Sequence, residues 1–210
     1  MNSSTEKLQL RGGAGPIEAL RDAASADAPA RGVAVIAHPH PLFGGTMDNK
    51  VVQTLARAFV ACGWTAVRFN FRGVGASEGE YDEGRAESED MQAVVAQVAP
   101  EGQIAIAGFS FGAFVASQVI DRLWAGRDIR QLVLVGTAAS RFPVAALPPE
   151  SHERALVVHG EQDDTVPLAS VMDWARPQSL PVTVVPGGGH FFHGQLPLLK
   201  SLVTRHLRAG

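Results

Sequence analysis

Short apolar runs that alternate with longer helical patterns constrain the fold of this chain more than any other feature. Residues 33–37 and 132–135 are apolar throughout, which is typical of parallel strands that are covered on both faces. Runs of this kind predict strands at residues 32–37, 65–70, 103–108, 131–136, 155–159 and 181–185. The segments between them predict helices at residues 49–62, 85–98, 111–125, 168–176 and 195–207. This alternation predicts an α/β fold with one doubly wound, mostly parallel sheet.

The amino-terminal segment has a different pattern. Residues 7–11 and 17–21 flank a glycine-rich turn and predict an antiparallel hairpin. The first predicted helix has Asp48 as its expected N-cap and Gly63 as its stop. A length of 210 residues, 46% of them hydrophobic, suffices for one sizeable core and not for two ordinary ones. We therefore expect residues 1–210 to form a single domain.

Residues 102–120 carry no charge, and their number reaches the length of a membrane-spanning helix. The character of this segment changes halfway. Its first part alternates branched and small side chains, a Gly-x-Ser-x-Gly turn follows, and apolar residues then recur at helical spacing. A strand, a sharp turn and a buried helix explain the pattern better than a membrane span.

Composition and charge narrow the classes of partner. The net charge is −3, from 18 basic and 21 acidic residues, and the basic residues form no stripe, so we expect neither nucleic acid nor membrane as a partner. The single cysteine, Cys62, excludes an internal disulfide framework, fits a reducing compartment and is expected to be a buried structural thiol. The first residues lack the pattern of a secretory signal. Together these features favour a cytoplasmic protein.

Ligands of doubly wound sheets bind beyond the carboxyl ends of the strands, and polar groups follow several of the predicted strands here. Ser110 lies in the sequence Gly-Phe-Ser-Phe-Gly between a predicted strand and a predicted helix. This context favours a nucleophile on a strained turn over a turn that merely contains serine. The expected ligand is a small molecule with an acyl group.

A serine nucleophile needs a base, and the base needs an acid to orient it. His190 follows three glycines directly after a predicted strand, whereas His193 lies at the entrance to the last helix. We therefore favour His190 as the base. Asp163 and Asp164 both follow the strand at 155–159. We favour Asp163 as the orienting acid and expect Asp164 to cap the loop or to be solvated.

An oxyanion hole requires two backbone N–H groups aimed at one point. Phe111, directly after the serine, would supply one of them. The second is expected from the loop at residues 38–45, in which the two prolines have no N–H. His40 and Leu42 remain as donors, and we favour His40.

Three phenylalanines near these residues in the sequence, Phe43, Phe109 and Phe191, are expected to bind the substrate, with core packing as the alternative. Several histidines together with Asp163 could suggest a metal site, but the spacing of metal ligands is absent. We expect no metal and no cofactor. The glycine-rich segment 72–75 lacks the pattern of a phosphate loop and favours a structural turn.

Five motifs, at residues 38–50, 69–79, 108–112, 159–167 and 188–192, resemble those of the small lidless bacterial α/β-hydrolases, a group of predicted serine hydrolases with a fold like that of the dienelactone hydrolases. The resemblance implies an α/β-hydrolase fold without a cap domain and a catalytic triad of Ser110, Asp163 and His190. It implies carboxylesterase-type cleavage of small acyl esters through an acyl-enzyme. Thioesterases, peptidases and amidases share this triad, and a non-catalytic scaffold is a further alternative. A monomer and a homodimer are both compatible with the sequence.

The segment between the strands at 131–136 and 155–159 is where relatives often insert a cap domain. Here it spans only residues 137–154 and contains three prolines. A segment of this length and composition predicts a stiff rim and not a folded lid. We therefore expect an open active site.

Overall fold

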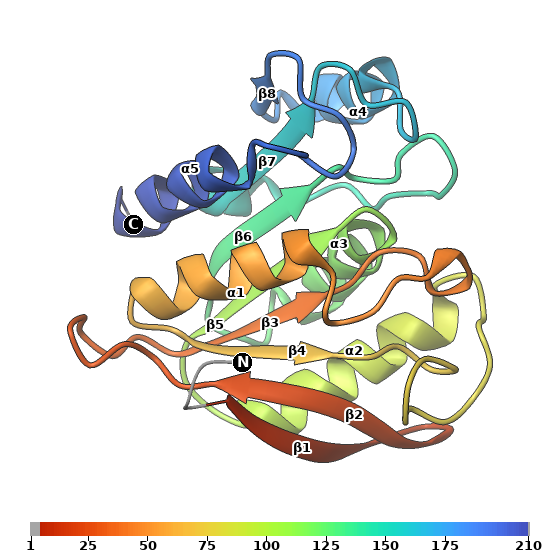
Figure 1. The fold of residues 1–210 in the computed structure, drawn as a ribbon, viewed down its shortest axis with the longest axis vertical. Helices are drawn as coiled ribbons and strands as arrows, with labels where there is room; N and C mark the ends of the chain where they lie inside the picture. Colours follow the sequence, from red (N-terminus) through yellow and green to blue (C-terminus); the bar gives the residue numbers. More distant parts are fainter. Residues whose placement is uncertain (1–4, 210) are drawn as a thin grey trace.

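The computed structural model describes residues 5–209, in which eight strands form one sheet (Figure 1). The order across the sheet is β1-β2-β4-β3-β5-β6-β7-β8. Neighbours from β4 to β8 pair in parallel, whereas the β1–β2 hairpin joins β4 antiparallel. The strands are β1 (Thr5–Gly12), β2 (Gly15–Asp22), β3 (Val33–Ala37), β4 (Thr65–Phe69), β5 (Ile104–Phe109), β6 (Ile129–Val135), β7 (Ala155–Gly160) and β8 (Val182–Val185). The predicted sheet and amino-terminal hairpin are confirmed.

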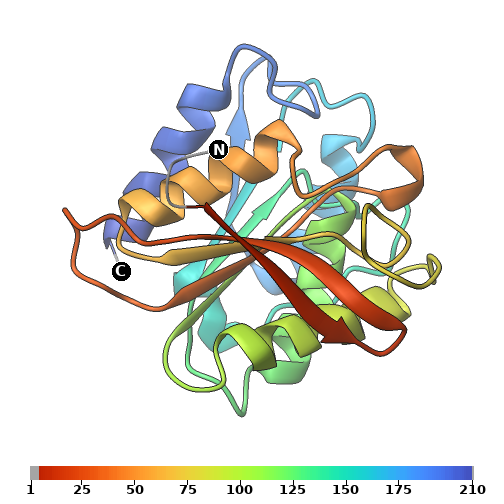
Figure 2. The ribbon, with the colours of Figure 1, turned by 60° about the horizontal axis from the view of Figure 1, so that its bottom comes forward.

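Five α-helices cover the two faces of the sheet (Figure 2). Helices α1 and α5 contribute to one apolar cluster, and α2, α3 and α4 contribute to the other. Because helices lie on both sides of the sheet, both of its faces are buried. The helices are α1 (Lys50–Ala61), α2 (Arg85–Val98), α3 (Phe111–Leu123), α4 (Leu168–Ala175) and α5 (Leu196–Ala209).

The central strand β5 is apolar throughout because it is buried on both faces. All six of its residues are buried. Ile104 and Ile106 belong to the cluster of α2 and α3, while Ala105, Ala107 and Phe109 belong to the cluster of α1 and α5. Successive side chains of a strand point to opposite faces, so a strand between two helical layers requires apolar residues at every position.

Local differences from the sequence-based predictions are small. The N-cap of α1 is Asn49, whose side chain accepts a hydrogen bond from the Val51 N–H at 2.9 Å. The assignment of Asp48 as the cap was wrong because its carboxylate instead pairs with Arg68. Strand β6 begins two residues earlier than predicted, and three 3₁₀ helices were not anticipated: η1 (Pro41–Phe43), η2 (Pro149–Arg154) and η3 (Arg176–Gln178).

The uncharged segment 102–120 is divided as predicted, with β5 and α3 on either side of Ser110. Within residues 5–209, no helix combines the length and the apolar character needed to cross a membrane. Cys62 is buried at the end of α1, as expected of a structural thiol. Residues 137–154 contain only the short helix η2, in agreement with a rim and not a lid.

A buried ion pair joins the hairpin to the parallel sheet. Arg68 of β4 lies 3.2 Å from Asp22 of β2, and its side chain is only 6% exposed. Arg68→Ala should lower the free energy of unfolding by about 3 kcal/mol, because the carboxylate of Asp22, which is only 14% exposed, loses its partner. Arg21→Ala, which breaks the exposed pair with Glu6, should cost about 1 kcal/mol or less.

Urea unfolding of both variants measures this difference. Equal losses for the two arginines would show that the buried pair does not hold the hairpin.

Candidate active site

Ser110 occupies a strained turn between β5 and α3. Its backbone has φ 58° and ψ −117°, a conformation that costs a non-glycine residue about 1–3 kcal/mol. The Ser110 N–H donates to the Val135 carbonyl at 2.8 Å, and the Ser110 carbonyl accepts from the Ala113 N–H at 3.0 Å. These bonds to β6 and α3 hold the serine in a conformation that it would not adopt alone.

The two glycines of this turn are required by space. A Cβ on Gly108 would lie 2.2 Å from the Gly112 carbonyl oxygen, and one on Gly112 would lie 2.4 Å from the Ala37 carbonyl oxygen. Any side chain at either position would therefore collide with backbone. The glycines let α3 begin directly against β5 and β3, which presents Ser110 at the carboxyl end of the sheet.

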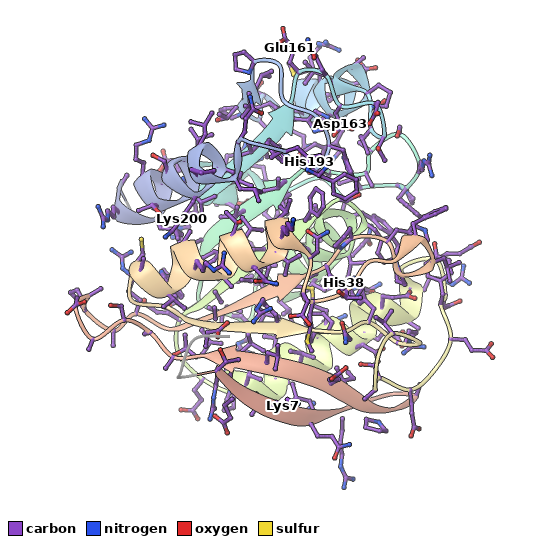
Figure 3. The ribbon with its side chains drawn as sticks, in the orientation of Figure 1. Lys7, His38, Glu161, Asp163, His193 and Lys200 are labelled. Carbon is purple, nitrogen blue, oxygen red and sulfur yellow. The ribbon has the colours of Figure 1, made fainter. Side chains whose placement is uncertain are left out.

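Three side chains from separate loops form one chain of hydrogen bonds. Ser110 Oγ lies 3.0 Å from His190 Nε2, and His190 Nδ1 lies 2.7 Å from Asp163 Oδ2. All three residues are buried. Asp163 is labelled in Figure 3, beyond the carboxyl end of β7. The structure thus brings together the three residues predicted to form the triad.

Asp163 is held as an ionised acceptor. Its Oδ1 accepts hydrogen bonds from the N–H groups of Val166 and Thr165 at 2.7 and 3.0 Å. Burial raises the pKa of Asp163, but the hydrogen bonds from His190 and Val166 together lower it by more. The net pKa is therefore below the usual value. A carboxylate can only accept, so the proton of neutral His190 lies on Nδ1, and Nε2 is free to accept from Ser110.

His159 is a site residue that sequence reasoning considered only as a metal ligand. It is fully buried at the end of β7. Its Nε2 lies 2.9 Å from the Val166 carbonyl and 3.4 Å from Asp163 Oδ2. Burial lowers the pKa of His159, and the neutral ring donates its Nε2–H to the Val166 carbonyl, which can only accept. The signal available in the sequence was its position at the end of a predicted strand, four residues before Asp163.

The turn that carries His190 is anchored in the core. Phe192 is fully buried with φ 51°, and its N–H donates to the Gly189 carbonyl at 3.1 Å. The His190 ring packs against Phe109 and Phe191, each with its ring centroid 5.0 Å away. These contacts fix the imidazole between the serine and the aspartate.

The two competing residues lie elsewhere. His193 is exposed, and its ring contacts Phe191 (Figure 3). Asp164 is exposed and accepts a hydrogen bond from the Thr165 hydroxyl at 3.2 Å. Within residues 5–209, neither of them makes a hydrogen bond to Ser110 or to His190.

The two candidate oxyanion donors in the loop after β3 differ in their hydrogen bonds. The Leu42 N–H donates to His40 Nδ1 at 3.2 Å, so this N–H is already engaged. No hydrogen bond of the His40 N–H occurs in the part of the chain that the structure describes. Phe111 is the first residue of α3, and its N–H has no partner within the helix.

The three phenylalanines expected to bind substrate differ in exposure. Phe43 is 74% exposed beside His40, and Phe191 is 42% exposed beside His190. Phe109 is fully buried, and its ring lies 5.0 Å from that of His190. It belongs to the cluster of α1 and α5, and its role in substrate binding stays a prediction.

The remaining motifs have structural roles. Arg72 forms a bidentate pair with Asp90 at 2.8 and 2.9 Å, so the glycine-rich segment 72–75 is a turn, as predicted. His38 is fully buried and joins two loops: its Nδ1 lies 2.6 Å from the Pro39 carbonyl, and its Nε2 accepts from the Phe71 N–H at 3.0 Å. Across residues 5–209, no group of three or more His, Cys, Asp and Glu side chains is arranged to hold a metal ion.

Comparisons with known proteins agree with this geometry. The model of the X-Pro dipeptidyl-peptidase (S15) family matches residues 23–123. The structure of an α/β serine hydrolase without a lid from Xanthomonas campestris is 33% identical and has a TM-score of 0.88, covering 100% of this chain and 96% of that one. An α/β serine hydrolase homologue from Coxiella burnetii is 38% identical with a TM-score of 0.81, covering 96% and 97%. An uncharacterized protein of Rickettsia prowazekii is 31% identical, covering 88% of this chain and 82% of its own length.

The fold and these relatives define a hydrolase of the α/β serine hydrolase type. The chain belongs to the family of α/β serine hydrolases without a lid.

Buried His38 makes stability depend on pH. Burial lowers its pKa from 6.5 to about 4. Between these values the unfolded state binds the proton and the folded state does not, so stability is lost as the pH falls from 6.5 toward 4. The loss due to His38 should be about 2 kcal/mol between about pH 7.5 and pH 5.

Urea unfolding at both pH values, for wild type and His38→Asn, tests this. The variant should show a smaller difference between the two pH values, whatever its absolute stability. The same difference in both proteins would contradict a neutral His38 in the folded state.

Proposed function

We propose that the protein hydrolyses small acyl esters through an acyl-enzyme on Ser110. The observation that carries the proposal is the unbroken hydrogen-bond chain from Ser110 through His190 to Asp163. Its tautomer and its burial match the requirements of a serine nucleophile with a general base. The proposal needs no cofactor, since water is the second substrate.

In the first step, Ser110 Oγ attacks the ester carbonyl carbon while its proton passes to His190 Nε2. The bond between the carbonyl carbon and the alcohol oxygen then breaks, and His190 gives the proton to the departing alcohol. In the second step His190 removes a proton from water, and the hydroxide attacks the acyl carbon. The serine leaves with the proton from His190, and the carboxylic acid is released.

The negative charge on the carbonyl oxygen would be stabilised by the N–H groups of Phe111 and His40. The engagement of the Leu42 N–H with the His40 ring supports His40 as the second donor. The ring of His40 also lies 3.2 Å from the Tyr81 hydroxyl through Nε2. Bonds on both sides of this ring hold the loop in place before the charge develops, which is how preorganised donors lower a barrier.

Two features support small, soluble substrates. The segment 137–154 forms a rim with one short 3₁₀ helix in place of a cap. The exposed ring of Phe43 lies beside His40, and the exposed ring of Phe191 lies beside His190. An open site of this kind covers a short acyl group and leaves a long chain in water.

A peptidase is the second candidate, because the S15 family model matches residues 23–123. That segment contains Ser110 and both proposed oxyanion donors. It ends before Asp163 and His190, so the match supports the nucleophile and not the complete triad. Cleavage of aminoacyl-proline amides is the activity to compare with ester hydrolysis.

Substitutions at neighbouring positions test the triad. Ser110→Ala and His190→Gln should each lower kcat by at least about a thousandfold with 4-nitrophenyl acetate, because nucleophile or base is lost. Asp163→Asn should lower it by a similar factor through the wrong tautomer of His190.

The matched controls are His193→Gln and Asp164→Asn, which remove the same chemical groups a few residues away. They should retain kcat within about twofold. Loss of activity in a control with retention in its partner would overturn the assignment of that residue.

A substrate panel tests the reaction class. Acetyl and butyryl 4-nitrophenyl esters should be cleaved with kcat/KM at least about tenfold above the palmitoyl ester, since the open site cannot bury a long chain. They should also exceed the matching thioester and an alanyl-proline 4-nitroanilide. A higher kcat/KM for the anilide would favour the peptidase.

A further inference from the structure

A groove of about 510 Å³ lies next to the proposed oxyanion loop and is not used by the triad. Two residues that line it, Tyr81 and Phe142, also contact the His40 ring, with centroid distances of 4.9 and 5.8 Å. The Phe142 ring lies 5.1 Å from that of Phe111, the neighbour of Ser110. The groove and the oxyanion loop are therefore adjacent and share these aromatic rings.

The apolar wall of the groove consists of aromatic rings. Phe142 stacks on Phe114 with ring centroids 4.8 Å apart and planes 14° apart. Both rings line the groove together with the Tyr81 ring. Such an aromatic surface can contact a short hydrocarbon chain and does not require one particular conformation of that chain.

The charged residues that line the groove are three arginines, Arg85, Arg122 and Arg141, and one carboxylate, Glu83. Arg85 is engaged by two carboxylates, those of Asp82 and Glu83. Arg122 donates only to the neutral hydroxyl of Ser88, at 2.9 Å. Within residues 5–209, no carboxylate forms a salt bridge with Arg122 or Arg141. Two guanidinium groups thus face one groove without an acidic partner.

The positive charge of Arg141 acts electrostatically on His40 of the proposed oxyanion loop. Burial lowers the pKa of His40 first, and the positive charge of Arg141 lowers it second. Arg141 is also next in sequence to Phe142, whose ring contacts His40. The cationic part of the groove and the proposed oxyanion donor are therefore neighbours.

We propose that this groove binds a carboxylate at the far end of the acyl chain, so that the preferred substrates are half-esters of short dicarboxylic acids. The inference rests on the proposed function, which determines the direction in which the acyl chain extends from Ser110. His190 must reach the alcohol oxygen to protonate it, so the alcohol lies on the side of His190 and Phe191. The acyl chain then extends the other way, past His40. Arginine binds carboxylates through two parallel N–H bonds.

The activity test compares two esters of nearly equal size. Mono-4-nitrophenyl glutarate carries the carboxylate, and 4-nitrophenyl methyl glutarate is its neutral counterpart. Wild type should cleave the charged ester with a kcat/KM about tenfold higher, and added salt should reduce this preference. The double variant Arg122→Gln/Arg141→Gln should lose the preference and retain its activity on the neutral ester.

The matched control is Arg57→Gln, an arginine on α1 on the opposite face of the sheet. It should leave both rates unchanged. Equal rates of wild type on the two esters, or an equal fall of both rates in the double variant, would overturn the inference.

A binding measurement separates this inference from the proposed function. In calorimetric titrations Ser110→Ala, which cannot cleave these ligands, should bind monomethyl glutarate more tightly than dimethyl glutarate, and the same protein with Arg122→Gln/Arg141→Gln added should bind both equally. Equal binding of the two ligands by Ser110→Ala would overturn the groove assignment even if wild type cleaves esters. Failure of a fluorophosphonate probe to label Ser110 would instead overturn the proposed function, and the titration would still decide whether the groove selects a carboxylate.

Discussion

The turn at Ser110 is the constraint on which the rest of the site depends. A serine with a positive φ is strained, and the turn exists only because β6 and α3 both bond to its backbone. Gly108 and Gly112 permit this arrangement by leaving no side chain between α3 and the neighbouring strands. The same turn gives Phe111 a free N–H at the start of α3. The proposed nucleophile and the proposed oxyanion donor are thus consequences of one local backbone conformation.

The second element of the site is a set of fixed proton positions. Asp163 accepts hydrogen bonds from two backbone N–H groups and from His190. These donors keep the carboxylate ionised and place the His190 proton on Nδ1. His38 also holds loops together: its neutral ring joins the backbone after β3 to the backbone after β4. Neutral buried histidines therefore support two of the loops that meet at the site.

Much of this arrangement could be predicted from sequence because its causes are local or periodic. The apolar runs of β3 and β6 required burial on both faces, and the glycines around Ser110 required a sharp turn. The choice of His190 over His193 followed from its position directly after a strand and three glycines. The burial of Phe109 could not be predicted, since whether a ring on β5 faces the core or the site depends on which face each strand position occupies. The contact of His159 with Asp163 likewise depends on how the loop after β7 folds back.

A direct test of the central claim is to trap the acyl-enzyme. Wild-type protein mixed with 4-nitrophenyl acetate and quenched in acid within milliseconds should carry one acetyl group, and mass spectrometry of its peptides should locate that group on Ser110. The account predicts this modification in wild type and its absence in Ser110→Ala. Turnover of the ester with Ser110 unmodified, or an acetyl group on another residue that forms as fast as turnover, would contradict it.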